Sequence, residues 1–222
     1  MENVKNTCGE EEFNPIGTST NQFKGTFEGS AKTISNLSIN RTNMDYVGLF
    51  GYNSGVIKGI NIKNINIEGK SQVGGLVGYN KGKVNEIIFE GKITGTGVVG
   101  GIAGTNAETV SNIVIKNIEL PSGRMAGGVV ATGGTVSNVV IEKGTINGSS
   151  ATGSGSAANI YYTDLVTIKY NKQGVKFSSN YINDLSYYAG KVETSIDGDK
   201  NNSGYFFDYD ESKNGIYVVK AY

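Results

Sequence analysis

Apolar residues recur along the first two thirds of the chain in a short block that is repeated five times. In each copy, three apolar positions are separated by two residues and then by one, and the last two positions alternate as in a half-buried strand. The copies begin at Ile34, Ile57, Val84, Val110 and Val136. A further apolar position, at Ile67, Ile93, Leu120 and Ile146, predicts another short strand in each of the later copies.

A glycine-rich block separates consecutive copies. Its clearest form is Val73-Gly74-Gly75-Leu76-Val77-Gly78, and the anchor glycines Gly48, Gly75, Gly101 and Gly128 lie 27, 26 and 27 residues apart. Three short strands per repeat predict an all-β fold, a parallel β-helix (solenoid) of about five coils that stack to bury one core. A leucine-rich repeat has a similar period, but it needs a convex and often helical segment where this chain has glycine pairs. The β-helix is therefore favoured.

The residues that follow the last apolar position of each block give an independent test of the register. They are Lys63, Glu90, Lys116 and Glu142. Stacked coil on coil they form a ladder of alternating charge, which stabilises neighbouring strands by about 0.2–1 kcal/mol per pair. An alignment shifted by one residue loses this alternation.

Composition narrows the classes of function. Basic and acidic residues balance at 20 each, which excludes the electrostatic footprint of a nucleic-acid-binding protein, and no apolar segment approaches the roughly 20 residues of a membrane span. There is no histidine, so neither a His-Glu-x-x-His zinc site nor a serine or cysteine nucleophile with its conventional base can form. Polysaccharide cleavage needs two facing carboxyl groups, and the acidic residues of the solenoid are scattered. We predict that the chain is not an enzyme.

The segment Val73-Gly74-Gly75-Leu76-Val77-Gly78-Tyr79-Asn80 and its copies resemble the GLUG motif of bacterial surface proteins. The upstream Phe23-Lys24-Gly25-Thr26-Phe27-Glu28-Gly29 resembles the stretch that opens such arrays, and the resemblance covers residues 14–148. It implies a β-helical rod with an extracellular or cell-wall location. Such repeats occur in adhesin-like proteins and in the non-catalytic regions of immunoglobulin-A-cleaving zinc metallopeptidases.

The domain organisation follows from where the repeat stops. We expect residues 1–22 to cap the solenoid of residues 23–148, and the small-residue segment 149–158 to be a linker. Residues 159–222, which are richer in aromatic side chains, are expected to form a C-terminal β-rich module or cap. Its clearest element is a hairpin in which the Asn214-Gly215 turn joins two strands, Tyr205 to Asp210 and Ile216 to Lys220.

Three outward positions on successive coils are apolar, namely Ile88, Val114 and Val140. Stacked apolar side chains are unexpected against water, and we predict that residues 159–222 or a neighbouring domain cover them. The alternative is that β-branched residues simply suit exposed strands. Tyr52 and Tyr79, each followed by asparagine, also recur on adjacent coils. A buried asparagine ladder with tyrosine beside it is favoured over a sugar- or peptide-binding platform.

The sequence from Asp197 to Asp208 has oxygen ligands at positions 1, 3, 5 and 12 of a calcium loop, at Asp197, Asp199, Asn201 and Asp208. The match is imperfect, because Asn202 stands where glycine is expected. The alternative is a polar hairpin loop. Calcium is the one candidate cofactor.

The sequence therefore predicts a non-catalytic binding or scaffold region of a bacterial cell-surface or secreted protein, an adhesin-like region that recognises a host protein or glycan. It is expected to be a monomer within a larger surface protein. Two alternatives stay open: an accessory region of a larger secreted zinc metallopeptidase, and a carbohydrate-active β-helix.

Overall fold

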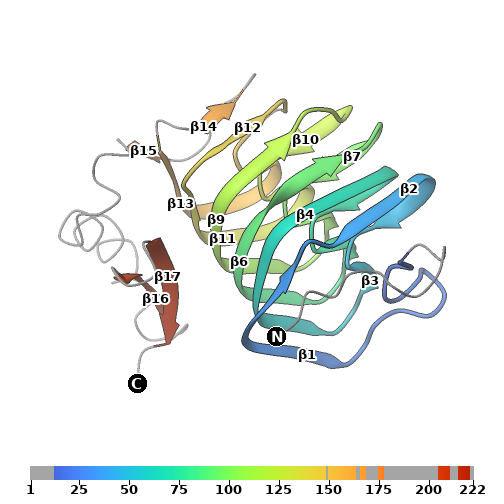
Figure 1. Cartoon of the computed structure of the whole chain (residues 1–222), viewed down its shortest axis with the longest axis horizontal. Coiled ribbons are helices and arrows are strands. Elements are labelled where there is room, and N and C mark those ends of the chain that lie inside the picture. The colour runs from blue at the N-terminus through green and yellow to red at the C-terminus, as the bar shows by residue number, and fades with distance from the viewer. Residues whose placement is uncertain are drawn as a thin grey trace.

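The computed structural model describes residues 13–148, 150–163, 166–168, 175–177, 205–210 and 215–220. Every regular element in these ranges is a β-strand (Figure 1). The strands are β1 (Thr26–Ser35), β2 (Ser38–Val47), β3 (Phe50–Asn53), β4 (Val56–Gly74), β5 (Val77–Asn80), β6 (Lys83–Thr94), β7 (Val98–Gly100), β8 (Ala103–Asn106), β9 (Thr109–Leu120), β10 (Met125–Gly127), β11 (Val130–Ile141), β12 (Gly144–Ile146), β13 (Ser154–Thr163), β14 (Val166–Ile168), β15 (Val175–Phe177), β16 (Tyr205–Asp210) and β17 (Gly215–Lys220).

The strands wind into a parallel β-helix of about five coils, which confirms the predicted fold. One face is the parallel series β1, β4, β6, β9, β11 and β13. The second is formed by β2, the later parts of β4, β6 and β9, and then β12 and β14. The third runs through β3, β5, β8 and the start of β11. A third parallel face stands where a leucine-rich repeat has its convex segment, so the solenoid is a β-helix and not a leucine-rich repeat.

The long strands contain residues in the left-handed conformation, both within the first face and where the chain passes to the second face. Asn64 in β4 has a φ of 51°, and a column on successive coils consists of Gly59, Glu86, Asn112 and Asn138, with φ between 54° and 65°. Glycine and asparagine tolerate this conformation, whereas other side chains pay roughly 1–2 kcal/mol. Glu86 is therefore the one strained member of its column.

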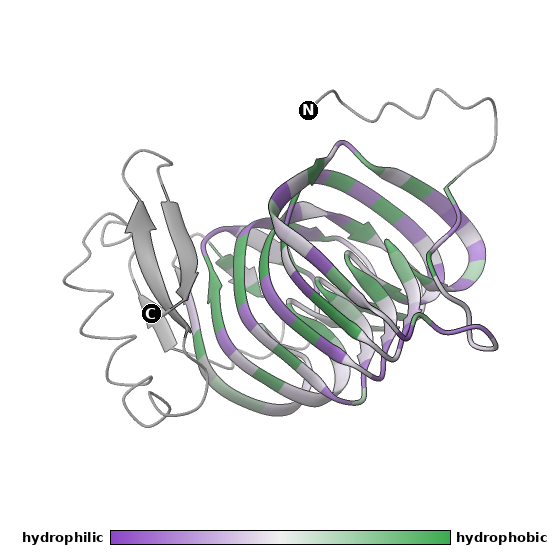
Figure 2. Cartoon of the chain, turned by 90° about the horizontal axis from the view of Figure 1, so that it is seen from below, coloured by the Kyte–Doolittle hydropathy of each residue, from purple (hydrophilic) through white to green (hydrophobic). Residues whose placement is uncertain are grey.

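The core is built from the apolar rows that the repeat predicts. Figure 2 shows hydrophobic and hydrophilic residues alternating along the coils. The additional apolar position of each repeat lies on the second face. Its residues, Ile67, Ile93, Leu120 and Ile146, are all fully buried. Glycine is required where backbones meet: a Cβ on Gly75 would lie 2.5 Å from the Gly101 carbonyl oxygen and 2.3 Å from Cζ of Phe89. The glycine blocks thus serve coil stacking, and the Phe89 ring uses the space that Gly75 leaves.

A ladder of buried asparagines closes the turn between the third face and the first. The Asn53 amide donates to Asn80 Oδ1, and the Asn80 amide donates to Asn106 Oδ1, both at 2.8 Å. Each amide also bonds the backbone two residues onward, as Asn80 does with the N–H and carbonyl of Gly82. Asn53 and Asn80 are fully buried. The predicted asparagine ladder is confirmed.

The charge ladder forms only in part. Lys116 Nζ lies 2.6 Å from Glu142 Oε1, and both side chains are largely shielded from water. Glu90, however, lies opposite Asn117, because the register shifts by one residue after Phe89. The prediction of a continuous ladder was wrong at this bulge, since a strictly periodic alignment contains no inserted residue.

The solenoid continues past residue 148, where a linker was predicted. β13 pairs in parallel with β11, with Val139 beside Ile160 and Ile141 beside Tyr162. β14 pairs with β12 in the same way. Residues 154–158 are thus strand rather than linker, and residues 160–163 and 166–168 belong to a further coil rather than to a separate module. Small residues permit this because backbone hydrogen bonds, not side chains, hold neighbouring coils together.

Both ends of the solenoid carry additional chain. Ile16 and Phe23 make isolated parallel bridges to Phe50 and Asn53, so residues 13–23 lie against the first coil. Residues 1–12 of the predicted N-terminal cap lie outside the described residues. The predicted C-terminal hairpin is present: β16 and β17 pair antiparallel, with Phe207 opposite Val218. β17 lies beside β6 and β9 of the solenoid.

Candidate functional site

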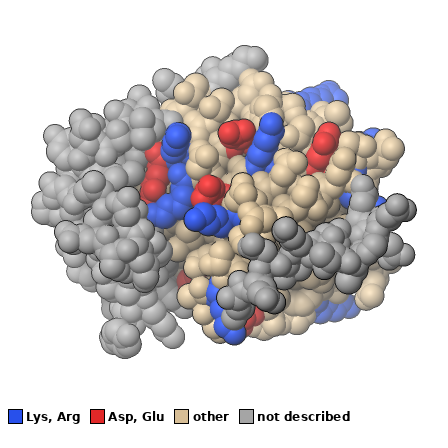
Figure 3. Space-filling model, viewed as in Figure 1, with Lys and Arg blue, Asp and Glu red and all other residues tan. Residues whose placement is uncertain are grey.

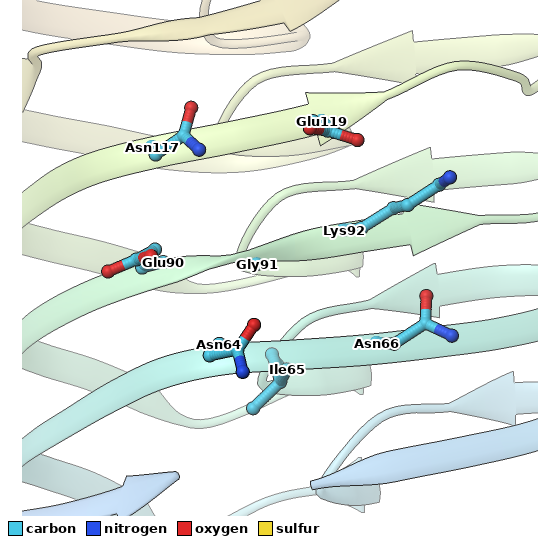
Figure 4. A pocket seen from close by; sticks show the side chains of 8 residues that line it. All are labelled: Asn64, Ile65, Asn66, Glu90, Gly91, Lys92, Asn117 and Glu119. Carbon is cyan, nitrogen blue, oxygen red and sulfur yellow. The ribbon is translucent and has the colours of Figure 1, made fainter. Parts of the chain in front are cut away.

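A groove lined mainly by polar residues crosses β4, β6 and β9 on the outside of the second face. Its volume is about 360 Å³, and it is shown in Figure 4. We call it the polar groove, and its lining residues are Asn64, Ile65, Asn66, Glu90, Gly91, Lys92, Asn117 and Glu119.

Strand alternation places these side chains together. Asn66, Lys92 and Glu119 are neighbours on three successive strands, and Glu90 is the neighbour of Asn117. The residues between them, Ile65, Gly91 and Ile118, also form one row, and Ile65 and Ile118 are buried in the core. Because side chains alternate between the faces of a strand, an apolar inner row fixes a polar outer row on each side of it.

The polar groove offers hydrogen-bonding groups that the protein itself does not use. Within the described ranges, no hydrogen bond or ion pair engages the side chains of Asn66, Lys92, Asn117 and Glu119. Asn64 is the exception, since its amide donates to Asn36 Oδ1 at 2.7 Å. Amide, ammonium and carboxylate groups side by side can donate to and accept from a hydroxyl-rich ligand.

A second groove of about 410 Å³ follows the turns that lead into β1, β4 and β6. We call it the turn groove. Lys24, Lys81 and Lys83 line it, together with Ser54, Glu108 and the turn glycines. All three lysines are exposed. The glycines are needed for stacking, because a Cβ on Gly55 or on Gly82 would come within 2.0 Å of a carbonyl oxygen of the coil below.

An aromatic cluster adjoins the turn groove. The Tyr52 and Tyr79 rings are stacked at 4.7 Å with an interplanar angle of 9°, and Tyr46 packs against both at 5.8 and 6.1 Å. The Lys81 ammonium lies 5.8 and 5.9 Å from the Tyr52 and Tyr79 ring centroids. Its hydrogen bond to the Tyr52 side chain raises the pKa of Lys81 above its ordinary value. Tyr52 is buried beside the asparagine ladder, whereas Tyr46 and Tyr79 keep partial exposure.

The apolar outward row that the sequence singled out is largely covered. Val114 and Val140 are fully buried, and Ile88 is half-buried. The row continues to Tyr161, the neighbour of Val140, where burial raises the pKa of the phenol. β17 lies beside β6 and β9, the strands that carry Ile88 and Val114.

The predicted calcium loop lies mostly outside the described residues. Asp197, Asp199 and Asn201 fall in residues 178–204, and only Asp208 has a described backbone, in the middle of β16. Among the side chains that the structure does describe, no group of three or more acidic or cysteine residues is placed to hold a metal ion.

Sequence reasoning missed both grooves. Asn66, Lys92 and Glu119 are ordinary surface residues until the register sets them side by side. The signal for the turn groove was available, since lysine precedes glycine at Lys24-Gly25 and at Lys81-Gly82, at equivalent turns two coils apart.

Comparisons with known proteins give two partial similarities. The chain is 36% identical over 88 residues to a halomucin of Haloquadratum walsbyi, a stretch that covers 37% of this chain and 1% of that protein. It is 34% identical over 83 residues to a putative Gly-rich membrane protein of Evansella cellulosilytica, covering 35% of this chain and 10% of the relative. No family model and no solved structure matches the chain.

No helix in the described ranges is long and apolar enough to cross a membrane. The chain spans at most a tenth of the length of the two curated relatives that it matches. These similarities favour a surface or structural protein built on a β-solenoid, and they identify no ligand.

Proposed function

We propose that this chain is a non-catalytic binding region of a cell-surface or secreted protein, an adhesin-like module that presents its polar groove to a host glycan. The observation that carries the proposal is a set of four polar side chains, Asn66, Lys92, Asn117 and Glu119, which have no hydrogen bond or ion pair within the described residues and lie on three neighbouring strands. Fixed backbone geometry lowers the entropy that binding costs, and polar groups at set spacings supply specificity.

The partial similarities and the GLUG-like repeat support a surface location. One relative is named as a halomucin and the other as a Gly-rich membrane protein. Basic and acidic side chains are interspersed on the face in Figure 3, so recognition there depends on local hydrogen bonding rather than on one broad field.

A glycan and matrix-protein array with the intact chain, with and without calcium, tests the proposal. We expect saturable binding to one class of glycan, weakened by the double substitution Asn66→Ala and Lys92→Gln. The control is Asn43→Ala with Lys70→Gln, which removes one amide and one ammonium from exposed positions outside the polar groove. An array with no ligand, or equal binding by both double variants, would overturn the proposal.

Polysaccharide hydrolysis is a second candidate, because the polar groove holds two glutamates. Glu90 lies opposite Asn117, two positions before Glu119 on the next strand. This offset separates their Cα atoms by roughly 8 Å, a spacing comparable to the 6.5–9.5 Å between the carboxyl groups of inverting glycosidases. The groove is open to water, which favours binding over catalysis. Release of reducing ends that Glu90→Gln and Glu119→Gln each abolish would establish an enzyme.

We also propose that the C-terminal hairpin docks on the row formed by Ile88, Val114 and Val140. The position of β17 beside β6 and β9 supports this contact. In hydrogen exchange, a chain truncated before residue 205 should lose protection in β6 and β9 and keep it in β3 and β5. Unchanged exchange in all four strands would refute the contact.

A further inference from the structure

Among the described residues, two lysines of the solenoid pair with a carboxylate, and neither lies in the turn groove. Lys58 pairs with Glu28 at 2.5 Å, and Lys116 pairs with Glu142 at 2.6 Å. In the part of the chain that the structure describes, no ion pair engages Lys24, Lys81 or Lys83. With Glu108 as the one acidic residue in the lining, the turn groove carries an excess of two positive charges in a chain whose formal net charge is zero.

Strand register brings the lysines within reach of one ligand. Lys83 lies beside Val56, which lies beside Thr26, so the groove spans three consecutive coils. Coils are about 4.8 Å apart, and Lys24 and Lys81 therefore lie roughly 10 Å apart along the axis. That distance matches two neighbouring sugar units better than one small anion.

The backbone N–H groups at the floor of the turn groove are already hydrogen-bonded within the protein, so a ligand must be recognised by the lysine side chains. The amide N–H groups of Val56 and Lys83 donate to the carbonyl groups of Gly25 and Gly55. The N–H of Gly55 donates to the Asn53 side chain, and that of Gly82 donates to Asn80. The turns therefore cannot offer the convergent N–H groups of a phosphate-binding nest. An anion is held by mobile ammonium groups, which suits irregularly placed sulfate or carboxylate groups.

The aromatic cluster adds apolar ring faces and hydroxyl groups to the lysines of the turn groove. Lys81 belongs both to the turn groove and to the tyrosine cluster, and Tyr46 and Tyr79 are partly exposed next to it. An aromatic ring offers an apolar face and a hydroxyl, and this combination fits the apolar and polar faces of a sugar ring.

We infer that the turn groove, through Lys24, Lys81, Lys83 and the adjoining Tyr79, is a second binding site that takes an anionic polysaccharide. This inference rests on the proposed function, because it gives the same glycan-binding module a second site with its own ligand class. The sulfate or carboxylate groups pair with the lysines while a sugar ring lies against the tyrosine cluster. Nucleic acid shares the charge, but the chain carries only two arginines, which lie outside the turn groove.

The test measures binding of heparin, polygalacturonate and neutral dextran to the intact chain by surface plasmon resonance at low and at high salt. We expect binding of a charged polymer, none of dextran, and loss of binding as salt rises, because exposed charges are screened. The variant K24Q/K81Q/K83Q should bind at least about tenfold more weakly. The control K32Q/K70Q/K143Q removes the same charge from exposed positions outside the turn groove and should bind like the wild type.

Heparin and polygalacturonate separate sulfate from carboxylate recognition, and binding of either supports the site. Equal loss in both triple variants would show a diffuse charge effect and overturn it, as would binding of a single-stranded oligonucleotide in place of both polymers. Array binding that depends on Asn66 and Lys92 without any binding of the charged polymers would overturn this inference and leave the proposed function standing. Tyr79→Phe should retain binding and Tyr79→Ala should weaken it, with circular dichroism confirming that both variants fold.

Discussion

The asparagine ladder yields the sharpest quantitative prediction, the effect of replacing Asn80 by alanine. Asn80 is fully buried and uses its amide completely. Its amide nitrogen donates to Asn106 Oδ1 and to the Gly82 carbonyl, and its Oδ1 accepts from the Asn53 amide and from the Gly82 N–H. Asn80→Ala removes all four hydrogen bonds, so Asn53, Gly82 and Asn106 each lose a hydrogen bond in a buried site.

The magnitude follows from these contacts. A typical net contribution of about 1 kcal/mol per hydrogen bond gives about 4 kcal/mol, and unsatisfied buried groups make this a lower bound. Asn80→Asp keeps the shape but cannot donate to Gly82 or to Asn106, so it should cost a similar amount. Both values are a large fraction of the 5–15 kcal/mol that is typical of a folded domain.

The assay is urea denaturation followed by circular dichroism, because the chain has no tryptophan. Asn43→Ala, at an exposed position, is the matched control. Hydrogen exchange should show the loss of protection concentrated in β3, β5 and β8, since each coil contacts chiefly its neighbours. A destabilisation below about 1 kcal/mol, equal to that of Asn43→Ala, would show that the ladder contributes little and refute the reasoning.

Three further predictions follow from backbone geometry and burial. Gly75→Ala should lower the free energy of unfolding by about 2–3 kcal/mol in urea denaturation, because its Cβ would meet Phe89 and the Gly101 carbonyl. Gly25→Ala is the control and should be tolerated, because the nearest atom, on the Phe23 ring, is 3.6 Å away. Equal effects of the two substitutions would contradict this. Glu86→Asn should raise the free energy of unfolding by about 0.5–1 kcal/mol, because asparagine accepts the φ of 58°, and a lowered midpoint would show that the carboxylate matters more. Burial raises the pKa of Tyr161, so the folded state holds its proton longer than the unfolded state, and stability should fall as pH rises above the ordinary tyrosine value near 10. Tyr161→Phe should flatten the decline between pH 9 and 11, and an unchanged slope would assign it to other groups.

The sequence predicted what depends on period and on residue type. The spacing of the glycine blocks was enough for the solenoid, and the Tyr-Asn repeats at Asn53 and Asn80 were enough for the buried ladder. Both arise from local patterns that recur once per coil. The Asn214-Gly215 turn likewise predicted the terminal hairpin, because turn chemistry is local.

The features that could not be predicted from the sequence arise where the chain departs from the repeat period. The bulge after Phe89 moves Glu90 away from Lys116, and no residue type announces it. The coil that contains Ile160 and Tyr162 follows its neighbour after 21 residues instead of 26, and small residues fill its first strand. The polar groove requires the register of three strands together, which periodicity alone fixes only to within such a shift.

The direction of the hydrogen bonds between coils has a mechanical consequence. In this solenoid those bonds lie along the axis, so tension between the two ends of the chain pulls coils apart one after another rather than shearing many bonds at once. Each coil of 26 or 27 residues would release roughly 80–90 Å of extended chain as it unspools. A solenoid that unspools in this way lengthens in steps and dissipates mechanical work as each coil opens.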